Sequence, residues 1–366
     1  MKFRSERDVL SEALQTVQRG VSTRPGIPAL TGVLMTVGEG GLTLLTTDLE
    51  VSTEVRVAVE VQDAGSVLVP ARLVADMVKA LPPDPVEFES DGAQARVVCR
   101  SFEGTLRCLP AEDFPSLREP EGTRVRVASG AFAEAVAQVV KAASRDEARP
   151  ILTGVLLEVN REGLTMVATD SYRLAIRELR ATGEGEARAL IPERAVSEAG
   201  RAAAGEEKGE VTIVLGESQA SFGVGEWGLT SRLIEGEFPN YRQLIPEPGA
   251  NRLAAPRQQL LEAVRRVGLL ARENSPVRME LNRLGARLTS SSPDLGEAVE
   301  AVEAEYQGEE ITIAFNPNYL GDGLAGAVGE RIQIELRDGL KPAVVRGESD
   351  EFTYLVMPIR LPAPVG

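Results

Sequence analysis

The chain has 366 residues, a formal net charge of −15, two cysteines and no histidine, and 43% of its residues are apolar. This length suits two or three domains, and the lack of histidine argues against zinc sites and histidine-based acid–base catalysis. The sequence has no long apolar run, and its opening MKFRSERDVL is polar. We therefore expect no transmembrane helix or signal peptide and a cytoplasmic protein.

The first elements are an opening strand, MKFRS, and a helix whose apolar face comprises Val9, Leu10, Ala13, Leu14 and Val17. Short strands with alternating apolar residues follow, as in STEVRVAVEV. A second helix is expected to begin near Pro70, and its counterparts later in the chain near Pro192 and Pro317, because proline suits the first turn of a helix.

A hairpin is predicted next, in VVCRSFEGTLRCLP from Val97. Glu103 and Gly104 would form its two-residue turn, which would place Cys99 opposite Cys108. That geometry permits a disulfide, whereas a reducing cytoplasm favours two free thiols.

The same elements then recur along the chain. LTGVLMTVGEGGLTLLTTD, which starts at Leu30, returns as LTGVLLEVNREGLTMVATD from Leu152 and faintly as LTSSSPD from Leu288. VPARLVADMVKAL from Val69 returns as IPERAVSEAGRAA and then as FNPNYLGDGLAGA. We predict three homologous repeats, 1–122, 123–246 and 247–366, each an α+β unit with two helices and antiparallel sheets.

Lysine and arginine concentrate on the predicted helices, and much of the acid lies on strands and loops. An acidic chain could therefore still offer one basic face that follows phosphates without reading bases. Ordinary solvated helix faces would give the same pattern.

Three motifs carry a resemblance over the whole chain: TDSYRL at Thr169–Leu174, FPNYRQLIP at Phe238–Pro246, and VMPIRL near the end. With the opening MKF and the three repeats, the chain resembles the bacterial DNA polymerase III beta subunit, the sliding clamp. The resemblance implies a head-to-tail homodimer in which six units close into a ring, with helices facing double-stranded DNA. It implies no catalysis, no metal and no cofactor.

The resemblance also implies partners, namely the replicative polymerase alpha subunit, the clamp loader, repair polymerases and mismatch-repair proteins. Their peptides would enter a pocket between repeats two and three, where a flexible methionine suits varied ligands. The matching residues are Leu152, Thr169, Ser171, Tyr172, Arg173, Leu174, Pro239, Leu244, Leu355, Met357, Pro358 and Ile359. Tyr172 and Gln243 depart from the family's familiar histidine and arginine, and a PAPVG tail follows the pocket.

Two further sites follow from the resemblance. DNA contact is expected at Arg24, Arg72, Arg145, Arg149 and Arg194, although Pro150 stands where the family can show an aromatic residue. The dimer interface would use the edge strand at Thr105–Cys108, with Leu106 inward, and Leu269, Leu270, Glu297 and Glu300 of the other chain.

Two alternatives need other chemistry. An enzyme would have to use carboxylates such as Asp48, Asp170 and Asp294, but these recur once per repeat and would be spread apart. Thr-Asp at a strand end is also a common turn initiator. The second alternative is an acidic repeat scaffold that binds proteins but not DNA.

Overall fold

The computed structural model describes residues 1–22, 26–117, 119–183, 185–206, 208–271 and 276–361. The chain divides into two compact bodies. The N-terminal body comprises Met1–Gly130 and Arg201–Leu233, and the C-terminal body comprises Ala131–Gly200 and Ile234–Gly366. Each is described separately below.

Two α-helices fall in each predicted repeat, which agrees with the sequence pattern. They are α1 (Arg7–Val17), α2 (Ala71–Ala80), α3 (Ser129–Val139), α4 (Glu193–Gly205), α5 (Arg257–Gly268) and α6 (Pro317–Gly326). Short 3-10 helices are η1 (Gln18–Gly20), η2 (Pro28–Thr31), η3 (Ala111–Asp113), η4 (Val140–Ala142), η5 (Pro150–Leu152) and η6 (Tyr241–Leu244). Among the described residues, no helix is long and apolar enough to cross a membrane.

The second helix of each repeat begins at the expected proline. Pro70 precedes α2, Pro192 precedes α4, and Pro317 is the first residue of α6. Asn316 caps α6, because its side chain accepts hydrogen bonds from the backbone N–H groups of Asn318 and Tyr319.

The N-terminal body contains two antiparallel sheets. The smaller runs β5-β1-β7-β8-β9, from β1 (Lys2–Ser5), β5 (Glu60–Asp63), β7 (Val86–Ser90), β8 (Gln94–Cys99) and β9 (Phe102–Arg107). Within this body, the strands of the larger sheet follow the order β10-β16-β17-β18-β4-β3-β2-β6. Its strands are β2 (Gly32–Gly38), β3 (Gly41–Thr47), β4 (Val51–Val57), β6 (Gly65–Pro70), β10 (Thr123–Ala128), β16 (Glu210–Leu215), β17 (Gln219–Val224) and β18 (Trp227–Arg232).

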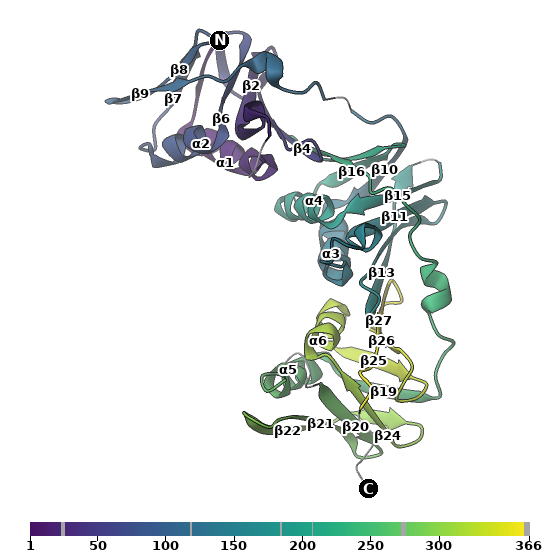
Figure 1. Cartoon of the computed structure of the whole chain (residues 1–366). Helices are drawn as coiled ribbons and strands as arrows, with labels where there is room; N and C mark the ends of the chain where they lie inside the picture. Colours follow the sequence, from purple (N-terminus) through teal and green to yellow (C-terminus); the bar gives the residue numbers. More distant parts are fainter. Residues whose placement is uncertain (23–25, 118, 184, 207, 272–275, 362–366) are drawn as a thin grey trace. The chain divides into compact units, whose positions relative to one another are not determined.

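The C-terminal body is built in the same way (Figure 1). Its larger sheet runs β15-β11-β12-β13-β27-β26-β25-β19-β23 and its smaller sheet β22-β21-β20-β24. The strands of repeat two are β11 (Gly154–Asn160), β12 (Gly163–Thr169), β13 (Arg173–Leu179), β14 (Thr182–Gly183) and β15 (Ala187–Pro192). Those of repeat three are β19 (Asn251–Pro256), β20 (Val277–Asn282), β21 (Gly285–Ser292), β22 (Gly296–Val302), β23 (Glu305–Gln307), β24 (Ile311–Phe315), β25 (Arg331–Leu336), β26 (Ala343–Arg346) and β27 (Phe352–Val356).

In each body a strand of one repeat pairs with a strand of the next. β4 pairs with β18 through five residue pairs from Trp227↔Val55 to Ser231↔Val51. β13 pairs with β27 in the same antiparallel manner, from Arg173↔Val356 to Arg177↔Phe352. Successive repeats are therefore joined by a backbone ladder as well as by the covalent chain.

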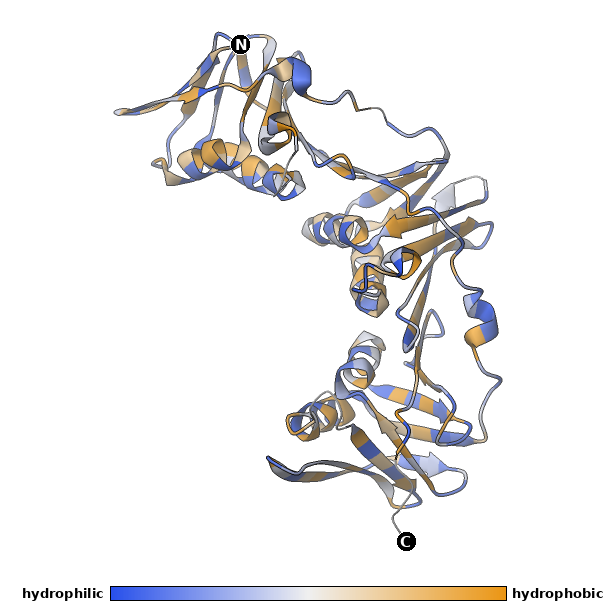
Figure 2. Ribbon diagram, viewed as in Figure 1, coloured by the Kyte–Doolittle hydropathy of each residue, from blue (hydrophilic) through white to orange (hydrophobic). Residues whose placement is uncertain are grey.

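The cores lie between helices and sheets, as the alternation of apolar residues predicts. In α1, Leu10, Ala13, Leu14 and Val17 are buried, but Val9 is 47% exposed, so its expected place on the apolar face is wrong. Figure 2 shows apolar residues banding the strands and one face of α1 and α2. Burial of these aliphatic side chains supplies most of the stabilisation in a chain with so few aromatics.

The predicted hairpin turn is wrong. Cys99 pairs with Phe102, so the turn is formed by Arg100 and Ser101, and Arg100 adopts a left-handed φ of 52°. Gly104 instead lies inside β9, where an added Cβ would come within 3.0 Å of Phe102 and 3.2 Å of Met77. Because of this register, the Cys108 backbone N–H donates to the carbonyl of Ala93, at the end of the hairpin away from Cys99. Both thiols are free.

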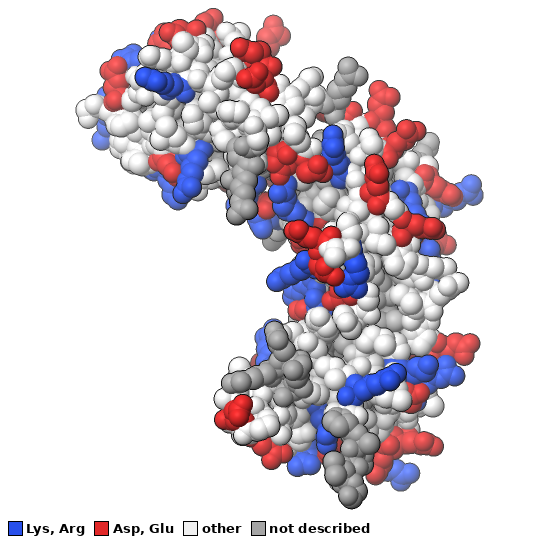
Figure 3. Space-filling model, in the orientation of Figure 1, with Lys and Arg blue, Asp and Glu red and all other residues white. Residues whose placement is uncertain are grey.

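The helical basic residues are largely exposed, as expected, but acid accompanies them. Arg72 is paired with Asp76 at 3.9 Å on α2, and Arg266 with Glu262 at 3.5 Å on α5. Figure 3 shows both signs of charge interspersed over the visible face. The separation of basic helices from acidic strands is therefore incomplete.

Candidate functional site

The Thr-Asp sequence that closes the repeated segment builds the same turn twice. Asp170 Oδ1 accepts hydrogen bonds from the N–H groups of Tyr172 (2.9 Å) and Arg173 (3.0 Å). Thr169 donates to the carbonyl of Arg173 at 2.6 Å, and Ser171 has a left-handed φ of 79°. Asp48 accepts in the same way from the N–H groups of Glu50 and Val51. These carboxylates serve as turn caps.

No metal-binding arrangement accompanies these carboxylates in the described chain. No group of three or more histidine, cysteine, aspartate or glutamate side chains is placed to hold a metal ion there. The Asp170 carboxylate is almost buried and is occupied by the turn and by Arg173.

Several of the predicted peptide-pocket residues lie at the β13–β27 junction. Leu174 and Leu355 are direct cross-strand partners, and Met357 N–H donates to the carbonyl of Tyr172 at 2.8 Å. We call this surface the C-terminal patch. It comprises Leu152, Thr169, Ser171, Tyr172, Arg173, Leu174, Pro239, Leu244, Leu355, Met357, Pro358 and Ile359.

The C-terminal patch has a buried floor and an exposed rim. Leu174 and Leu355 belong to an apolar cluster with Phe238, Tyr241 and Val344, among others. The rim carries large apolar side chains that a folded chain normally covers: Tyr172 is 59% exposed, Leu244 48%, Met357 40% and Ile359 36%. Such a patch is typical of a surface that receives a partner. The PAPVG tail lies outside the described residues.

Arg173 is already fully engaged by the protein itself. Its guanidinium contacts Asp170 at 3.0 Å and Asp322 of α6 at 2.5 Å, and lies 4.3 Å from the centre of the Tyr319 ring. Burial alone would disfavour its charge, but Tyr354, Asp322 and Asp170 outweigh burial and raise the pKa of Arg173. Arg173 thus ties β13 to α6, and its part in holding a peptide stays a prediction from the resemblance.

The connector between repeats two and three is held by one carboxylate. Glu158 on β11 accepts hydrogen bonds from Tyr241 (2.6 Å) and Arg242 (2.9 Å) and pairs with Arg188 at 3.3 Å. Burial, followed by the hydrogen bond to Glu158, raises the pKa of Tyr241. This contact fixes the segment that presents Pro239 and Leu244 to the C-terminal patch.

The DNA candidates are exposed where the structure describes them, and Arg24 lies outside the described residues. Arg72 lies on α2 and Arg194 on α4, both solvent-exposed. Arg149 hydrogen-bonds Asp146 at 3.0 Å and Ser171 at 3.2 Å. Arg145 and Arg149 also line a cavity of about 460 Å³, together with Tyr172, Arg173 and residues of α6.

Sequence reasoning missed the contribution of α6 to this cavity, namely Asn318, Tyr319 and Asp322. The only available signal was the repeat alignment of FNPNYLGDGLAGA, which places these residues on the second helix of repeat three. Asp322 also pairs with Lys141 at 3.6 Å, so repeats two and three meet through a charged contact here.

The dimer candidates differ in character. β9 is an edge strand and Leu106 points inward, as predicted, because Leu106 is only 3% exposed and packs into the core of its own body. Leu269 is 80% exposed. Glu300 already binds Arg266 of α5 at 2.6 and 3.0 Å, and this bond lowers the pKa of Glu300.

The sequence of the chain matches a known protein family over nearly its whole length. Sequence models of the DNA polymerase III beta subunit match in chain order: the N-terminal domain at residues 1–118, the central domain at 126–240 and the C-terminal domain at 242–360. The beta sliding clamp of Streptomyces coelicolor is 40% identical over 99% of this chain and its own full length. That of Pseudomonas aeruginosa is 35% identical over the same shares.

Solved structures agree. The DnaN sliding clamp of Pseudomonas aeruginosa bound to griselimycin is similar to this chain with a TM-score of 0.94 and 34% identity, covering 99% of this chain and all of that one. The beta subunit of Thermotoga maritima has a TM-score of 0.90 at 28% identity, with the same coverage. The chain therefore belongs to the bacterial DNA polymerase III beta subunit family, the beta sliding clamps, which are non-catalytic processivity factors.

Proposed function

We propose that the chain is a replication clamp that encircles double-stranded DNA as a head-to-tail homodimer and tethers the replicative polymerase. Its partners are the polymerase alpha subunit, the clamp loader, repair polymerases and mismatch-repair proteins, and it works in the cytoplasm. The repeats end near residues 122 and 246. The observation that carries the proposal is the full-length match to sliding clamps together with the C-terminal patch.

A ring explains how an acidic protein works on DNA. Linkage to the duplex is topological, so the contacts of Arg72, Arg145, Arg149 and Arg194 with phosphates stay weak and sensitive to salt. Contacts of that kind do not read sequence and permit sliding.

Topological binding is tested by loading the protein on nicked circular DNA with a clamp loader and then cutting the circle. A ring is retained on the circle and is lost from the ends of the linear form. Retention after linearisation would instead indicate ordinary groove binding. Failure to load, in a chain that still binds polymerase peptides, would favour the acidic scaffold.

The C-terminal patch is tested separately by deleting Met357–Ile359. We expect binding of a polymerase-derived peptide to be lost, whereas the native mass stays that of a dimer. Unchanged peptide affinity would overturn the assignment of the patch. A native mass of one chain for the unmodified protein at micromolar concentration would overturn the ring.

A further inference from the structure

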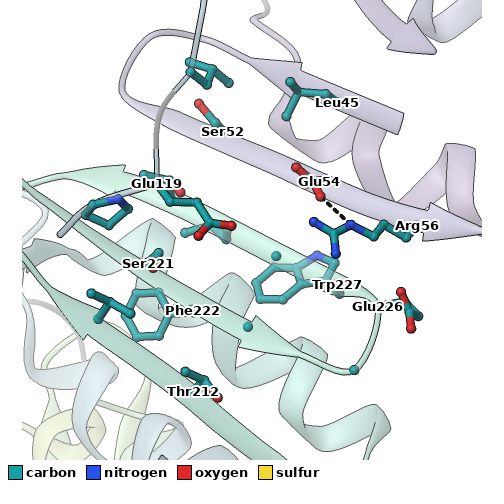
Figure 4. A pocket seen from close by; sticks show the side chains of 18 of the residues that line it. Leu45, Ser52, Glu54, Arg56, Glu119, Thr212, Ser221, Phe222, Glu226 and Trp227 are labelled. Carbon is teal, nitrogen blue, oxygen red and sulfur yellow. Dashed lines mark hydrogen bonds and ion pairs between the residues drawn. The ribbon is translucent and has the colours of Figure 1, made fainter. Parts of the chain in front are cut away.

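The internal repeat places a second groove at the equivalent junction of the N-terminal body. Here β4 pairs with β18, as β13 pairs with β27 in the other body. A cavity of about 300 Å³ lies on the outer face of these strands, bounded by Leu117, Glu119 and Pro120 of the connector (Figure 4). We call it the N-terminal groove.

Its floor is polar where the C-terminal patch is apolar. Ser52 and Thr230 are the cross-strand pair that corresponds to Leu174 and Leu355, because each serine or leucine stands four residues after the repeated Thr-Asp. Ser221, which pairs with Thr230, corresponds to Val344. An apolar peptide anchor would therefore meet a more polar floor here, although Leu45 and Val214 also line the groove.

Two glycines lie side by side in this floor. Gly223 of β17 pairs directly with Gly228 of β18, and neither has a left-handed φ. An added Cβ at Gly223 would meet nothing within 4 Å, and one at Gly228 would come only to 4.0 Å from its neighbours. Neither the backbone conformation nor the packing requires glycine at these two positions. Glycine weakens a strand, so its presence here needs another reason. Glycine inside a strand often marks the close approach of another backbone.

The walls favour a positive charge. Three carboxylates, Glu54, Glu119 and Glu226, line the groove with two arginines, Arg56 and Arg124. Arg56 is already bonded to Glu54 at 2.9 Å. Two carboxylates, Glu119 and Glu226, then remain with one arginine, Arg124. Trp227, the only tryptophan of the chain, is half-buried at the groove, and Figure 4 shows the Arg56 side chain next to it and Glu226 further off. The face of an indole ring attracts a cation.

We propose that the N-terminal groove binds an extended, arginine-containing segment of a partner protein, with the segment's backbone over Gly223 and Gly228 and an arginine at the Glu226 carboxylate, near the Trp227 end of the groove. This site goes beyond the proposed clamp function, because it differs in place and chemistry from the patch that receives polymerase peptides. It gives one chain two separate docking sites with opposite preferences.

The sole tryptophan makes the test direct. The full chain is titrated at low salt with a capped glycine–serine peptide that contains two arginines, and Trp227 emission is followed. We expect a saturable change that weakens as salt is added. Glu226→Gln should lower the affinity about two- to five-fold, as for the loss of an exposed ion pair, and Gly223→Val should abolish binding by filling the floor.

Gly223→Val should fold, because valine suits a strand and its side chain enters open space. Its thermal unfolding and its affinity for a polymerase peptide serve as controls, and Leu174→Ala serves as the matched variant in the C-terminal patch. No saturable change, equal binding of a peptide with glutamate in place of arginine, or binding unaltered by both groove variants would overturn the proposal. So would an equal response to the apolar polymerase peptide, or an emission change with protein concentration alone, which would indicate a second copy of the chain.

Discussion

The N-terminal groove and the C-terminal patch share one framework and differ in what they present. In both, a Thr-Asp turn with a left-handed residue, Leu49 or Ser171, leads into a strand that pairs with the next repeat. The outward side chains are Ser52 and Thr230 in one and Leu174 and Leu355 in the other. The repeated residues therefore build the backbone, while the binding chemistry resides in the outward positions where the repeats diverge.

The largest effect is expected when a residue of the C-terminal patch is replaced by its counterpart from the N-terminal groove. Leu355→Thr removes a side chain that is 4% exposed and places a hydroxyl in an apolar cluster. We expect a loss of about 3–4 kcal/mol in the free energy of unfolding, together with loss of polymerase-peptide binding. Denaturant unfolding and calorimetric titration measure the two effects. The matched variant, Thr230→Leu, should change stability by less than about 1 kcal/mol, and equal costs for both would contradict the contrast.

A second difference lies at the residue after each turn. Arg173 bridges Asp170 and Asp322, whereas its counterpart Val51 is simply buried. Arg173→Met leaves Asp170 without its cation and Asp322 with Lys141 alone. We expect a cost of about 2–3 kcal/mol, below that of a fully buried pair because Asp322 remains 29% exposed. Thermal unfolding measures this cost, and Val51→Met, the control, should be milder. A neutral Arg173→Met would show that the bridge is not structural.

The connectors that follow repeats one and two are also held differently. Glu158 holds Tyr241 and Arg242, whereas the corresponding residue of repeat one is Thr36, which hydrogen-bonds Ser66 instead. Glu158→Gln should cost about 1–2 kcal/mol of polymerase-peptide affinity, because the connector loses a charge-assisted anchor. Titration calorimetry measures the affinity, and limited proteolysis near Leu244 should accelerate. Unchanged affinity with faster proteolysis would separate the connector from the patch.

The smallest expected effect concerns the floor of the N-terminal groove. If Gly223 is not needed for folding, Gly223→Ala should stabilise the protein by about 0.4–1 kcal/mol, because alanine restricts the unfolded chain. Gly104→Ala, also on a strand but crowded by Phe102 and Met77, should destabilise it. Thermal unfolding of the two variants measures the difference. Destabilisation by Gly223→Ala would mean that folding, not ligand access, requires this glycine.

Repetition made the fold predictable from the sequence, and divergence limited the prediction of the site. Aligned blocks located the second helices at Pro70, Pro192 and Pro317 correctly. The hairpin turn was misplaced because Gly104 was interpreted as a turn residue, although it lies inside β9 close to Phe102 and Met77, and Arg100 takes the left-handed position. Asp322 was missed because its partner Arg173 is 149 residues away in sequence, and no local pattern reports such a contact.

The ladders between β4 and β18 and between β13 and β27 have a mechanical consequence. Two repeats joined by a hydrogen-bonded strand pair resist separation as a unit, because several backbone bonds must break together before either strand moves away. The connecting segment at each junction thus crosses a continuous sheet and cannot act as a flexible hinge between the two repeats. A closed assembly of such chains would part first where separate molecules meet, and its seam would determine how readily a strand of DNA is admitted.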